Sequence, residues 1–277
     1  VRSNIDGTLY THNYGKISSI AMDPMEKKPL YHFFPGHNIL SVGSYGCNMR
    51  CDFCQNWNIS QKSSLNLKRN TDPDKLAEEA VSTHHNIGIA FTYNEPVIWF
   101  EFVRDTAIRV REKGLFTVMV SNGYVNKDPL NEMFDFIDAF NIDLKAFNES
   151  FYRKLTGAEP DPVKESLKAI SRAGKHLEIT TLIIPGRNDS VEEMKLQSEW
   201  IAGEIGEETP LHLSRYFPRF RRDDPSTTHD TLERLMEAAS EKLKYVYLGN
   251  THGDSGQNTH CSKCGTLVTK RSGYSTQ

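Results

Sequence analysis

The chain has 277 residues, 38% hydrophobic and 25% charged, which is typical of a globular protein large enough for one sizeable core. Its formal net charge of −3 provides no general basic field, so neither nucleic acid nor a membrane surface is an expected partner. No apolar run is long enough to span a membrane, and five clustered cysteines, an odd number, argue against a secreted disulfide framework and for the reducing cytoplasm.

Residues 1–37 are predicted to form a short β-rich lead-in. Strands are expected at 8–10 and 17–22, with a turn at 13–15 between them. Three prolines then interrupt a loop that carries Glu26-Lys27-Lys28. We expect these to be exposed charges, although a position just before the next strand would also suit a lid.

From Ile39 onward, strands alternate with helices, which predicts βα units and a parallel sheet. Six strands are too few to close an eightfold barrel, so a partial (β/α)6, TIM-barrel-like α/β domain is expected over residues 38–248. No Gly-x-Gly-x-x-Gly follows a strand, which argues against a dinucleotide-binding sheet. Asp72 before Pro73, and Ser190 before Glu193, are good helix-start signals. The expected strands are 39–43, 87–91, 115–120, 139–144, 177–184 and 211–214, with a further short one at 245–248. The expected helices are 72–85, 96–113, 128–136, 161–173, 190–205 and 226–243.

Three of the five cysteines, Cys47, Cys51 and Cys54, fall within eight residues on the loop that leaves the first barrel strand. Iron–sulfur clusters are usually held by four cysteine thiolates. Three thiolates would leave one iron open to another ligand. A structural zinc knuckle is the alternative, but the neighbourhood supplies no fourth protein ligand for it. The spacing therefore favours an iron–sulfur site with one open position.

The spacing Cys47-x3-Cys51-x-Phe53-Cys54 matches the signature of the radical S-adenosylmethionine (SAM) superfamily, which this chain resembles. Four motifs resemble the pyruvate formate-lyase-activating-enzyme branch: residues 46–56, Phe91-Thr-Tyr-Asn-Glu-Pro96, Ser121-Asn-Gly-Tyr124 and Asn141-Ile-Asp-Leu-Lys145. Residues 23–36 and Arg215-Tyr-Phe-Pro218 are similar to the radical SAM component of the AmmeMemoRadiSam system. The resemblance covers nearly the whole chain. It implies a partial barrel with a 4Fe-4S cluster, whose open iron is chelated by SAM, and release of a 5′-deoxyadenosyl radical.

The same resemblance suggests which residues contact SAM. Asn94 and Glu95 stand in the family's Gly-Gly-Glu segment, which meets the SAM amino group, with Tyr93-Asn94 in place of the two glycines. Ser121 and Asn122 match the segment that lines the ribose side, and Asp143 and Lys145 match the pair that flanks the methionine part. Asp143 and Lys145 are two residues apart on a strand and so share one face, although taken alone they would be an ordinary strand-end ion pair. The residues expected to bind SAM are Asp52, Phe53, Asn94, Glu95, Ser121, Asn122, Asp143 and Lys145. No catalytic residue is assigned.

A glycine-rich loop leads into a tail, 249–277, that contains Cys261-x-x-Cys264. This pair resembles half of a zinc ribbon and is a candidate second metal site. Four interpretations compete: zinc completed by His252 or His260, zinc shared with another segment, a redox-active dithiol, or a disordered end. The chain begins at Val1, not Met, and members of the AmmeMemoRadiSam family usually carry a cysteine-containing N-terminal segment. Zinc shared with such a segment is therefore the favoured expectation.

The expected function is that of a radical SAM oxidoreductase that abstracts hydrogen from a protein or a small molecule. A glycyl radical enzyme activase is the more specific alternative. The non-enzymatic alternative is a zinc-binding interaction module that uses all five cysteines structurally. An electron donor such as flavodoxin or ferredoxin is the expected partner, together with SAM and a protein substrate in the activase case. The sequence does not specify the substrate.

Overall fold

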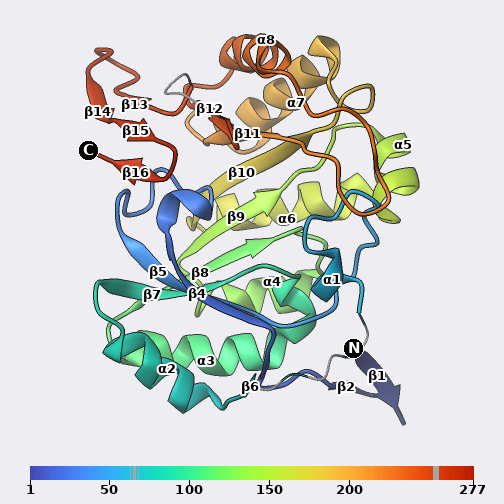
Figure 1. The fold of residues 1–277 in the computed structure, drawn as a ribbon, viewed down its shortest axis with the longest axis vertical. Coiled ribbons are helices and arrows are strands. Elements are labelled where there is room, and N and C mark those ends of the chain that lie inside the picture. The colour runs from blue at the N-terminus through green and yellow to red at the C-terminus, as the bar shows by residue number, and fades with distance from the viewer. Residues whose placement is uncertain (63, 65–66, 68, 252–255) are drawn as a thin grey trace.

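The computed structural model describes residues 1–62, 64, 67, 69–251 and 256–277. Its central feature is an eight-stranded sheet in the order β12-β11-β10-β9-β8-β7-β5-β4, in which every neighbouring pair is parallel except β4 with β5 (Figure 1). Six βα units run from β5 to β12, which confirms the predicted α/β partial barrel. The strands are β4 (Ser19–Pro24), β5 (Asn38–Gly43), β7 (Asn86–Phe91), β8 (Phe116–Ser121), β9 (Ala139–Asp143), β10 (His176–Ile183), β11 (Leu211–Arg215) and β12 (Val246–Gly249).

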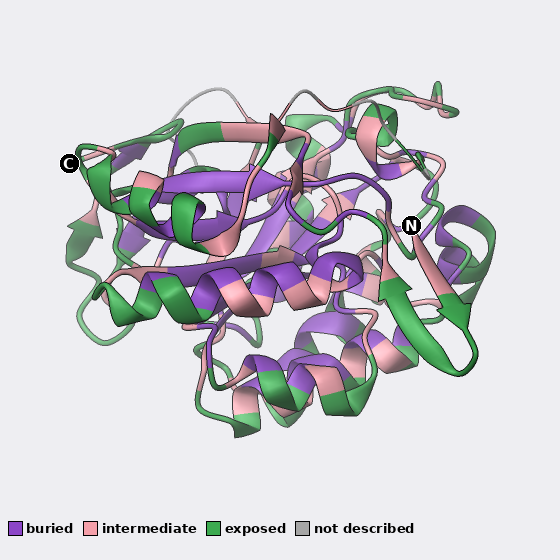
Figure 2. Cartoon of the chain, turned by 90° about the horizontal axis from the view of Figure 1, so that it is seen from below, coloured by how far each residue is buried: buried purple, intermediate pink, exposed green. Residues whose placement is uncertain are grey.

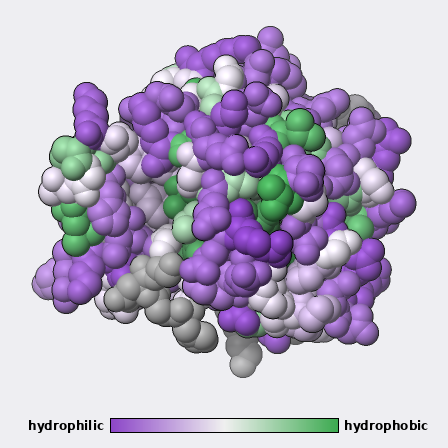
Figure 3. Space-filling model, turned by 90° about the horizontal axis from the view of Figure 1, so that it is seen from above, coloured by the Kyte–Doolittle hydropathy of each residue, from purple (hydrophilic) through white to green (hydrophobic). Residues whose placement is uncertain are grey.

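The connecting helices pack on the outer face of this sheet, with their buried sides turned toward it (Figure 2). Two of them begin as the sequence predicts: Asp72 accepts a hydrogen bond from the Lys75 N–H, and Ser190 accepts one from the Glu193 N–H. The face that carries the last two helices is mostly hydrophilic (Figure 3). The helices are α2 (Pro73–Ser82), α3 (Phe100–Glu112), α4 (Lys127–Met133), α6 (Pro160–Arg172), α7 (Val191–Glu204) and α8 (His229–Ser240), with short turns α1 (Trp57–Ser60), α5 (Glu149–Phe151), η1 (Met25–Lys27), η2 (Pro96–Trp99) and η3 (Tyr152–Thr156). In the described part of the chain, no helix is long and apolar enough to cross a membrane.

The lead-in differs from expectation in how its strands pair. β2 (Thr8–Thr11) pairs with β1 (Arg2–Ile5), not with 17–22, and this hairpin stands away from the body of the molecule (Figure 2). The predicted strand at 17–22 is divided into two. β3 (Lys16–Ile17) pairs with β6 (Arg69–Asn70), and β4 joins the main sheet along β5.

The segment that follows β4 enters the concave side of the sheet. Met25 and Leu30 are fully buried there in a small core with inward-facing strand residues such as Val118 and Ala139. The expectation of exposed charge at Glu26-Lys27-Lys28 is therefore wrong for two of the three residues, because Glu26 and Lys28 are both 2% exposed. Each is buried with an ionic partner, which is how a fold accommodates buried charge.

The tail is ordered, so the disordered-end interpretation is wrong for its described residues. It forms two antiparallel hairpins, and its fully buried Arg271 reaches into the barrel. The Arg271 guanidinium donates to the Tyr31 carbonyl at 2.8 Å and forms an ion pair with Glu26. The tail thereby fixes the lead-in segment inside the barrel. The tail strands are β13 (Thr259–His260), β14 (Leu267–Thr269), β15 (Arg271–Ser272) and β16 (Ser275–Thr276).

Candidate functional site

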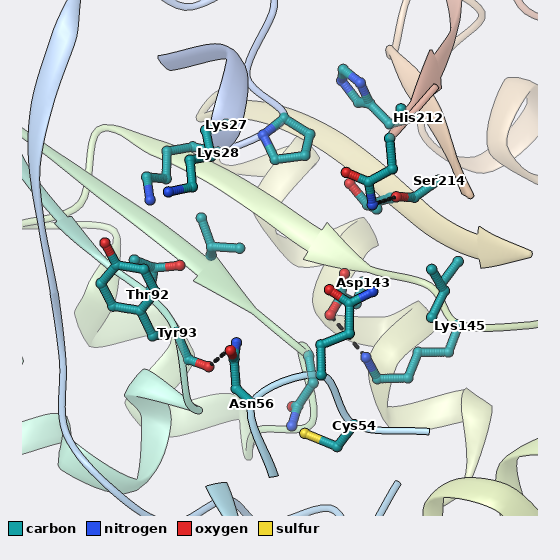
Figure 4. Close-up of a pocket in the computed structure, with 18 of the residues that line it drawn as sticks. Lys27, Lys28, Cys54, Asn56, Thr92, Tyr93, Asp143, Lys145, His212 and Ser214 are labelled. Atoms are coloured by element: carbon teal, nitrogen blue, oxygen red, sulfur yellow. Dashed lines mark hydrogen bonds and ion pairs between the residues drawn. The ribbon is translucent and has the colours of Figure 1, made fainter. Parts of the chain in front are cut away.

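A cavity of about 830 Å³ lies on the concave side of the sheet (Figure 4). Its walls come from the cysteine loop, the C-terminal ends of β7, β8, β9 and β11, the lead-in segment and the tail. In barrel folds, loops at the C-terminal ends of the strands commonly build the active site. The volume is within the range typical of small-molecule and cofactor pockets.

The cysteine loop brings all three predicted cluster cysteines, Cys47, Cys51 and Cys54, to the cavity wall. Two backbone hydrogen bonds, from the Arg50 N–H to the Thr156 carbonyl at 2.8 Å and from the Asp52 N–H to the Leu155 carbonyl at 3.0 Å, hold the loop against η3. The loop is thus fixed by its backbone, which leaves the thiols free for another role.

Burial disfavours the thiolate form of two of these cysteines. Burial, reinforced by the Glu95 carboxylate, raises the pKa of Cys47 to about 12, and burial raises that of Cys51 to about 11. A bound metal would hold these two thiols deprotonated. Among the described residues, no three His, Cys, Asp or Glu side chains are grouped for a single metal ion. All three thiols nevertheless line one cavity, where they would be available to a cluster.

Glu95 is the centre of a buried network beside the cysteines. Its carboxylate accepts hydrogen bonds from the Ser121 hydroxyl at 2.7 Å, the Asn122 N–H at 2.8 Å and the Val97 N–H at 3.0 Å. Burial raises the pKa of Glu95, while these donors oppose the shift. The Asn122 amide also lies 3.6 Å from the Cys47 sulfur, so the network reaches the cysteine loop.

Asp143 and Lys145 form an ion pair at the end of β9, with the Lys145 Nζ 2.8 Å from the Asp143 carboxylate. Burial opposes the ammonium, but the Asp143 carboxylate outweighs it and raises the pKa of Lys145. Both backbone polar groups of Lys145 are hydrogen-bonded. Its N–H donates to the Tyr152 hydroxyl, and its carbonyl accepts from the Asn188 amide.

Asn94 and Tyr93 show how the chain replaces two glycines of the family motif. The Asn94 side chain accepts from the Ser44 N–H at 2.9 Å and donates to the Gly46 carbonyl at 3.1 Å, so it supports the start of the cysteine loop. Tyr93 has φ 72°, a left-handed conformation that glycine adopts easily and a tyrosine adopts rarely. Tyr93 therefore holds a backbone conformation that suits glycine and adds a ring to the cavity wall.

Of the expected SAM-binding residues, only Asp52 lies outside the cavity lining. Its carboxylate lies 3.5 Å from the Arg222 guanidinium. The neighbouring Phe53 is 3% exposed and lines the cavity beside the cysteines, with its ring 5.7 Å from that of Phe151. The structure brings together the remaining expected residues, namely Phe53, Asn94, Glu95, Ser121, Asn122, Asp143 and Lys145.

Several lining residues were missed by the sequence analysis. Lys27 and Lys28 come from the lead-in, Tyr274 comes from the tail, and His212, expected only to be packed, is 2% exposed yet also reaches the wall. These residues meet only through long-range contacts, so no local spacing indicates them. The Lys pair, placed among prolines just before the first barrel strand, was the one available signal.

The second cysteine pair is separate from the cavity lining. Cys261 and Cys264 lie in the turn of the first tail hairpin, where the Gly265 N–H donates to the Cys261 carbonyl. A hydrogen bond with the Thr266 hydroxyl lowers the pKa of the exposed Cys264 thiol. His260 is exposed next to the pair, and His252 lies outside the described residues.

Comparisons with known proteins agree with this arrangement. A family model described as the radical SAM superfamily matches residues 41–196. An uncharacterized protein of Methanocaldococcus jannaschii is 43% identical over 273 residues, 98% of this chain and 81% of that protein. Pyruvate formate-lyase 1-activating enzyme of Escherichia coli is 26% identical over 154 residues, which cover 52% of this chain and 60% of the enzyme.

Solved structures share the fold. Streptococcus suis SuiB bound to S-adenosylmethionine superposes with a TM-score of 0.62 at 15% sequence identity. The superposition covers 77% of this chain but only 52% of SuiB. At this level of identity the likeness concerns the fold alone.

Proposed function

The chain belongs to the radical SAM superfamily, and from that premise we propose that Cys47, Cys51 and Cys54 ligate its 4Fe-4S cluster while the cavity beside them holds SAM. The single observation that carries this assignment is that all three thiols and seven of the eight expected SAM-binding residues line one cavity. When bound, the cluster supplies the electron that cleaves SAM reductively and yields a 5′-deoxyadenosyl radical.

Each protein group in the cavity has a role that its chemistry allows. The Asp143 carboxylate and the Lys145 ammonium, already paired at 2.8 Å, complement the amino and carboxylate groups of the methionine part. Ser121 and Asn122, ordered by Glu95, would line the ribose side of bound SAM. Phe53, which is 3% exposed beside the cysteines, would shield the cluster from water. Glu95 acts mainly by positioning, because three protein donors already occupy its carboxylate.

Anaerobic reconstitution with iron and sulfide tests this proposal. It predicts about four irons and four sulfides per chain and, with a strong reductant, formation of 5′-deoxyadenosine from SAM. Bound zinc without cleavage is the result expected of an interaction module. Family membership already disfavours that alternative, because it makes this chain a radical SAM enzyme.

For the wider role, we propose membership of the AmmeMemoRadiSam group, in which a radical SAM component acts with partner proteins. Support comes from the lead-in, 23–36, and from Arg215-Tyr-Phe-Pro218. Electrons would come from a flavodoxin or a ferredoxin. Activation of a glycyl radical enzyme is the second candidate, favoured by the likeness to pyruvate formate-lyase 1-activating enzyme. That candidate predicts a glycyl-radical doublet in the electron paramagnetic resonance spectrum of a co-encoded partner, and absence of the doublet from every such partner contradicts it.

For the tail, we propose that Cys261 and Cys264 are half of a zinc site completed by another cysteine-containing segment. Support comes from their shared turn and from the lowered pKa of Cys264, since zinc binds thiolate. Zinc analysis of this chain and of a version extended at its N-terminus tests the idea. Greater zinc content in the extended chain, lost in its Cys261→Ala/Cys264→Ala variant, is expected; equal zinc in both chains contradicts a shared site.

A further inference from the structure

Two lysines lie at the end of the cavity opposite the cluster cysteines. In Figure 4, the ammonium groups of Lys27 and Lys28 lie above Tyr93, at the side of the cavity away from Cys54. The cysteine end is the part proposed for the cluster and SAM. The lysine end is therefore the part of the same cavity that remains for a substrate.

The two ammonium groups share one carboxylate. The Nζ atoms of Lys27 and Lys28 each lie 2.7 Å from a different oxygen of Asp23, and the Tyr93 hydroxyl also donates to Asp23 at 2.7 Å. Asp23 thus accepts three hydrogen bonds, and its one negative charge leaves the lysine pair with a net charge of +1. An ammonium has three N–H donors, and among the described residues each of these lysines uses one of them on Asp23. Both side chains line the cavity, and that of Lys27 is 43% exposed, so its remaining donors are accessible to a ligand.

The lysines are carried on a rigid segment. The Asn141 amide on β9 donates to the Pro29 carbonyl at 2.8 Å. The Glu178 carboxylate on β10 accepts from the Tyr31 and His32 N–H groups at 2.9 and 2.7 Å. These hydrogen bonds fix the backbone next to Lys28 to two barrel strands. The Lys28 side chain is therefore in place before a ligand binds, which is how a binding site is preorganised.

Burying the Lys28 ammonium costs free energy, which suggests that this position serves a function. Its side chain is 2% exposed, and burial lowers the pKa of its ammonium to about 8, although Asp23 opposes the shift. Tyr93, held in its strained left-handed conformation, places its ring 4.9 Å from the Lys28 Nζ. Strained backbone and buried charge gather at functional sites more often than elsewhere.

The carboxylate nearest the lysines, Asp23, is already paired with both ammonium groups. Thr92, Thr180 and Ser214 are neutral, and His212 is occupied by Glu178 at 2.7 Å. The Glu26 carboxylate is neutralised by Arg271. A negatively charged group that enters this end of the cavity therefore meets two ammonium groups and neutral hydroxyls.

We propose that Lys27 and Lys28 form a subsite for an anionic group, a carboxylate or a phosphate, on the molecule from which hydrogen is abstracted. This inference rests on the proposed function, because it places the substrate beyond SAM in the same cavity. It defines the substrate class as an acid and assigns the lysine pair to its recognition. The lysines bind and orient the acid and take no part in the radical step.

Calorimetric titration of the reconstituted, SAM-bound enzyme with inorganic phosphate, and separately with succinate, tests the subsite. The buffer contains neither anion, and chloride keeps the ionic strength constant. Binding of at least one anion is expected, and Lys27→Met should weaken it about tenfold, the loss typical of one charged hydrogen bond. Lys28→Arg should retain binding better than Lys28→Met. The control is Lys195→Met, which removes an exposed charge on α7 and should bind as the wild type does.

Absence of binding by the wild type overturns the subsite, as does equal binding by Lys27→Met and wild type. If Lys28→Met does not fold, the half-exposed Lys27 still carries the test. Phosphate and succinate together show which kind of acid is preferred. SAM cleavage by the same wild-type preparation separates the two ideas: cleavage without anion binding overturns only the subsite, and anion binding without cleavage contradicts only the proposed function.

Discussion

The Lys145 ammonium and the Asp143 carboxylate meet at 2.8 Å on the rim of β9, and both line the cavity beside the cysteines. If this pair complements the methionine part of SAM, Lys145→Met removes a charged hydrogen bond worth about 1.5–3 kcal/mol. The KM for SAM in the cleavage assay should then rise about tenfold or more. Lys195→Met, which removes an exposed charge on α7, is the control. An unchanged KM in Lys145→Met would remove this residue from the SAM site.

Glu95 links β7 to the end of β8 through three accepted hydrogen bonds. In Glu95→Gln, an amide NH2 replaces one acceptor oxygen and faces a donor in a fully buried site. The free energy of unfolding should fall by about 1–3 kcal/mol. Urea denaturation measures it, with the exposed Glu112→Gln as the control. Equal stability of Glu95→Gln and wild type would contradict the network.

Arg271 connects the tail to the lead-in through its ion pair with Glu26 inside the barrel. Arg271→Met leaves the Glu26 carboxylate buried without its cation, which should cost about 3–5 kcal/mol of unfolding free energy. Glu26→Gln/Arg271→Met removes the stranded charge and should recover part of that loss. A double variant as unstable as the sum of the two single variants would show that the ion pair is not coupled.

Glu178 predicts a pH dependence of stability. Burial opposes its ionised form, but hydrogen bonds from His176 and His212 outweigh burial and hold the pKa below its ordinary value of about 4.5. Below that value the unfolded chain binds more protons at this group than the folded chain. The stabilisation is therefore complete above about pH 4.5 and declines as the pH falls toward the folded pKa. The gap in unfolding free energy between wild type and Glu178→Gln should narrow from pH 6 to pH 3.5. A gap that stays constant would contradict the shifted pKa.

Most of the barrel could be predicted from the sequence, because its strands are apolar runs and its helices carry local start signals such as Asp72 and Ser190. The seven expected SAM-binding residues at the cavity came from the resemblance to the radical SAM family, and a parallel sheet brings most of them together because it gathers its strand ends at one edge. The pairing of β2 with β1 was missed although it has a local signal: Asp6-Gly7, with φ 51° and 85°, is the two-residue turn that typically joins antiparallel strands.

The burial of charged residues in the lead-in differs more from the expectation than the strand pairing does. Lys28 and Glu26 look like surface residues in a proline-rich loop, and their ionic partners allow them to be buried: Asp23, five residues from Lys28, and the distant Arg271 for Glu26. Asp52 shows the converse: it lies within the cysteine motif, yet its carboxylate turns toward Arg222 on a distant loop. Such contacts depend on the tertiary fold and leave no local pattern.

The most direct test of the central claim is 5′-deoxyadenosine formation and iron content in anaerobically reconstituted Cys51→Ala, beside wild type and Cys264→Ala. Cys51→Ala should lose the cluster and all SAM cleavage, whereas Cys264→Ala, changed at an exposed tail thiol, should keep both. Cleavage of SAM by Cys51→Ala at the wild-type rate would contradict the assignment of the three cysteines to the cluster.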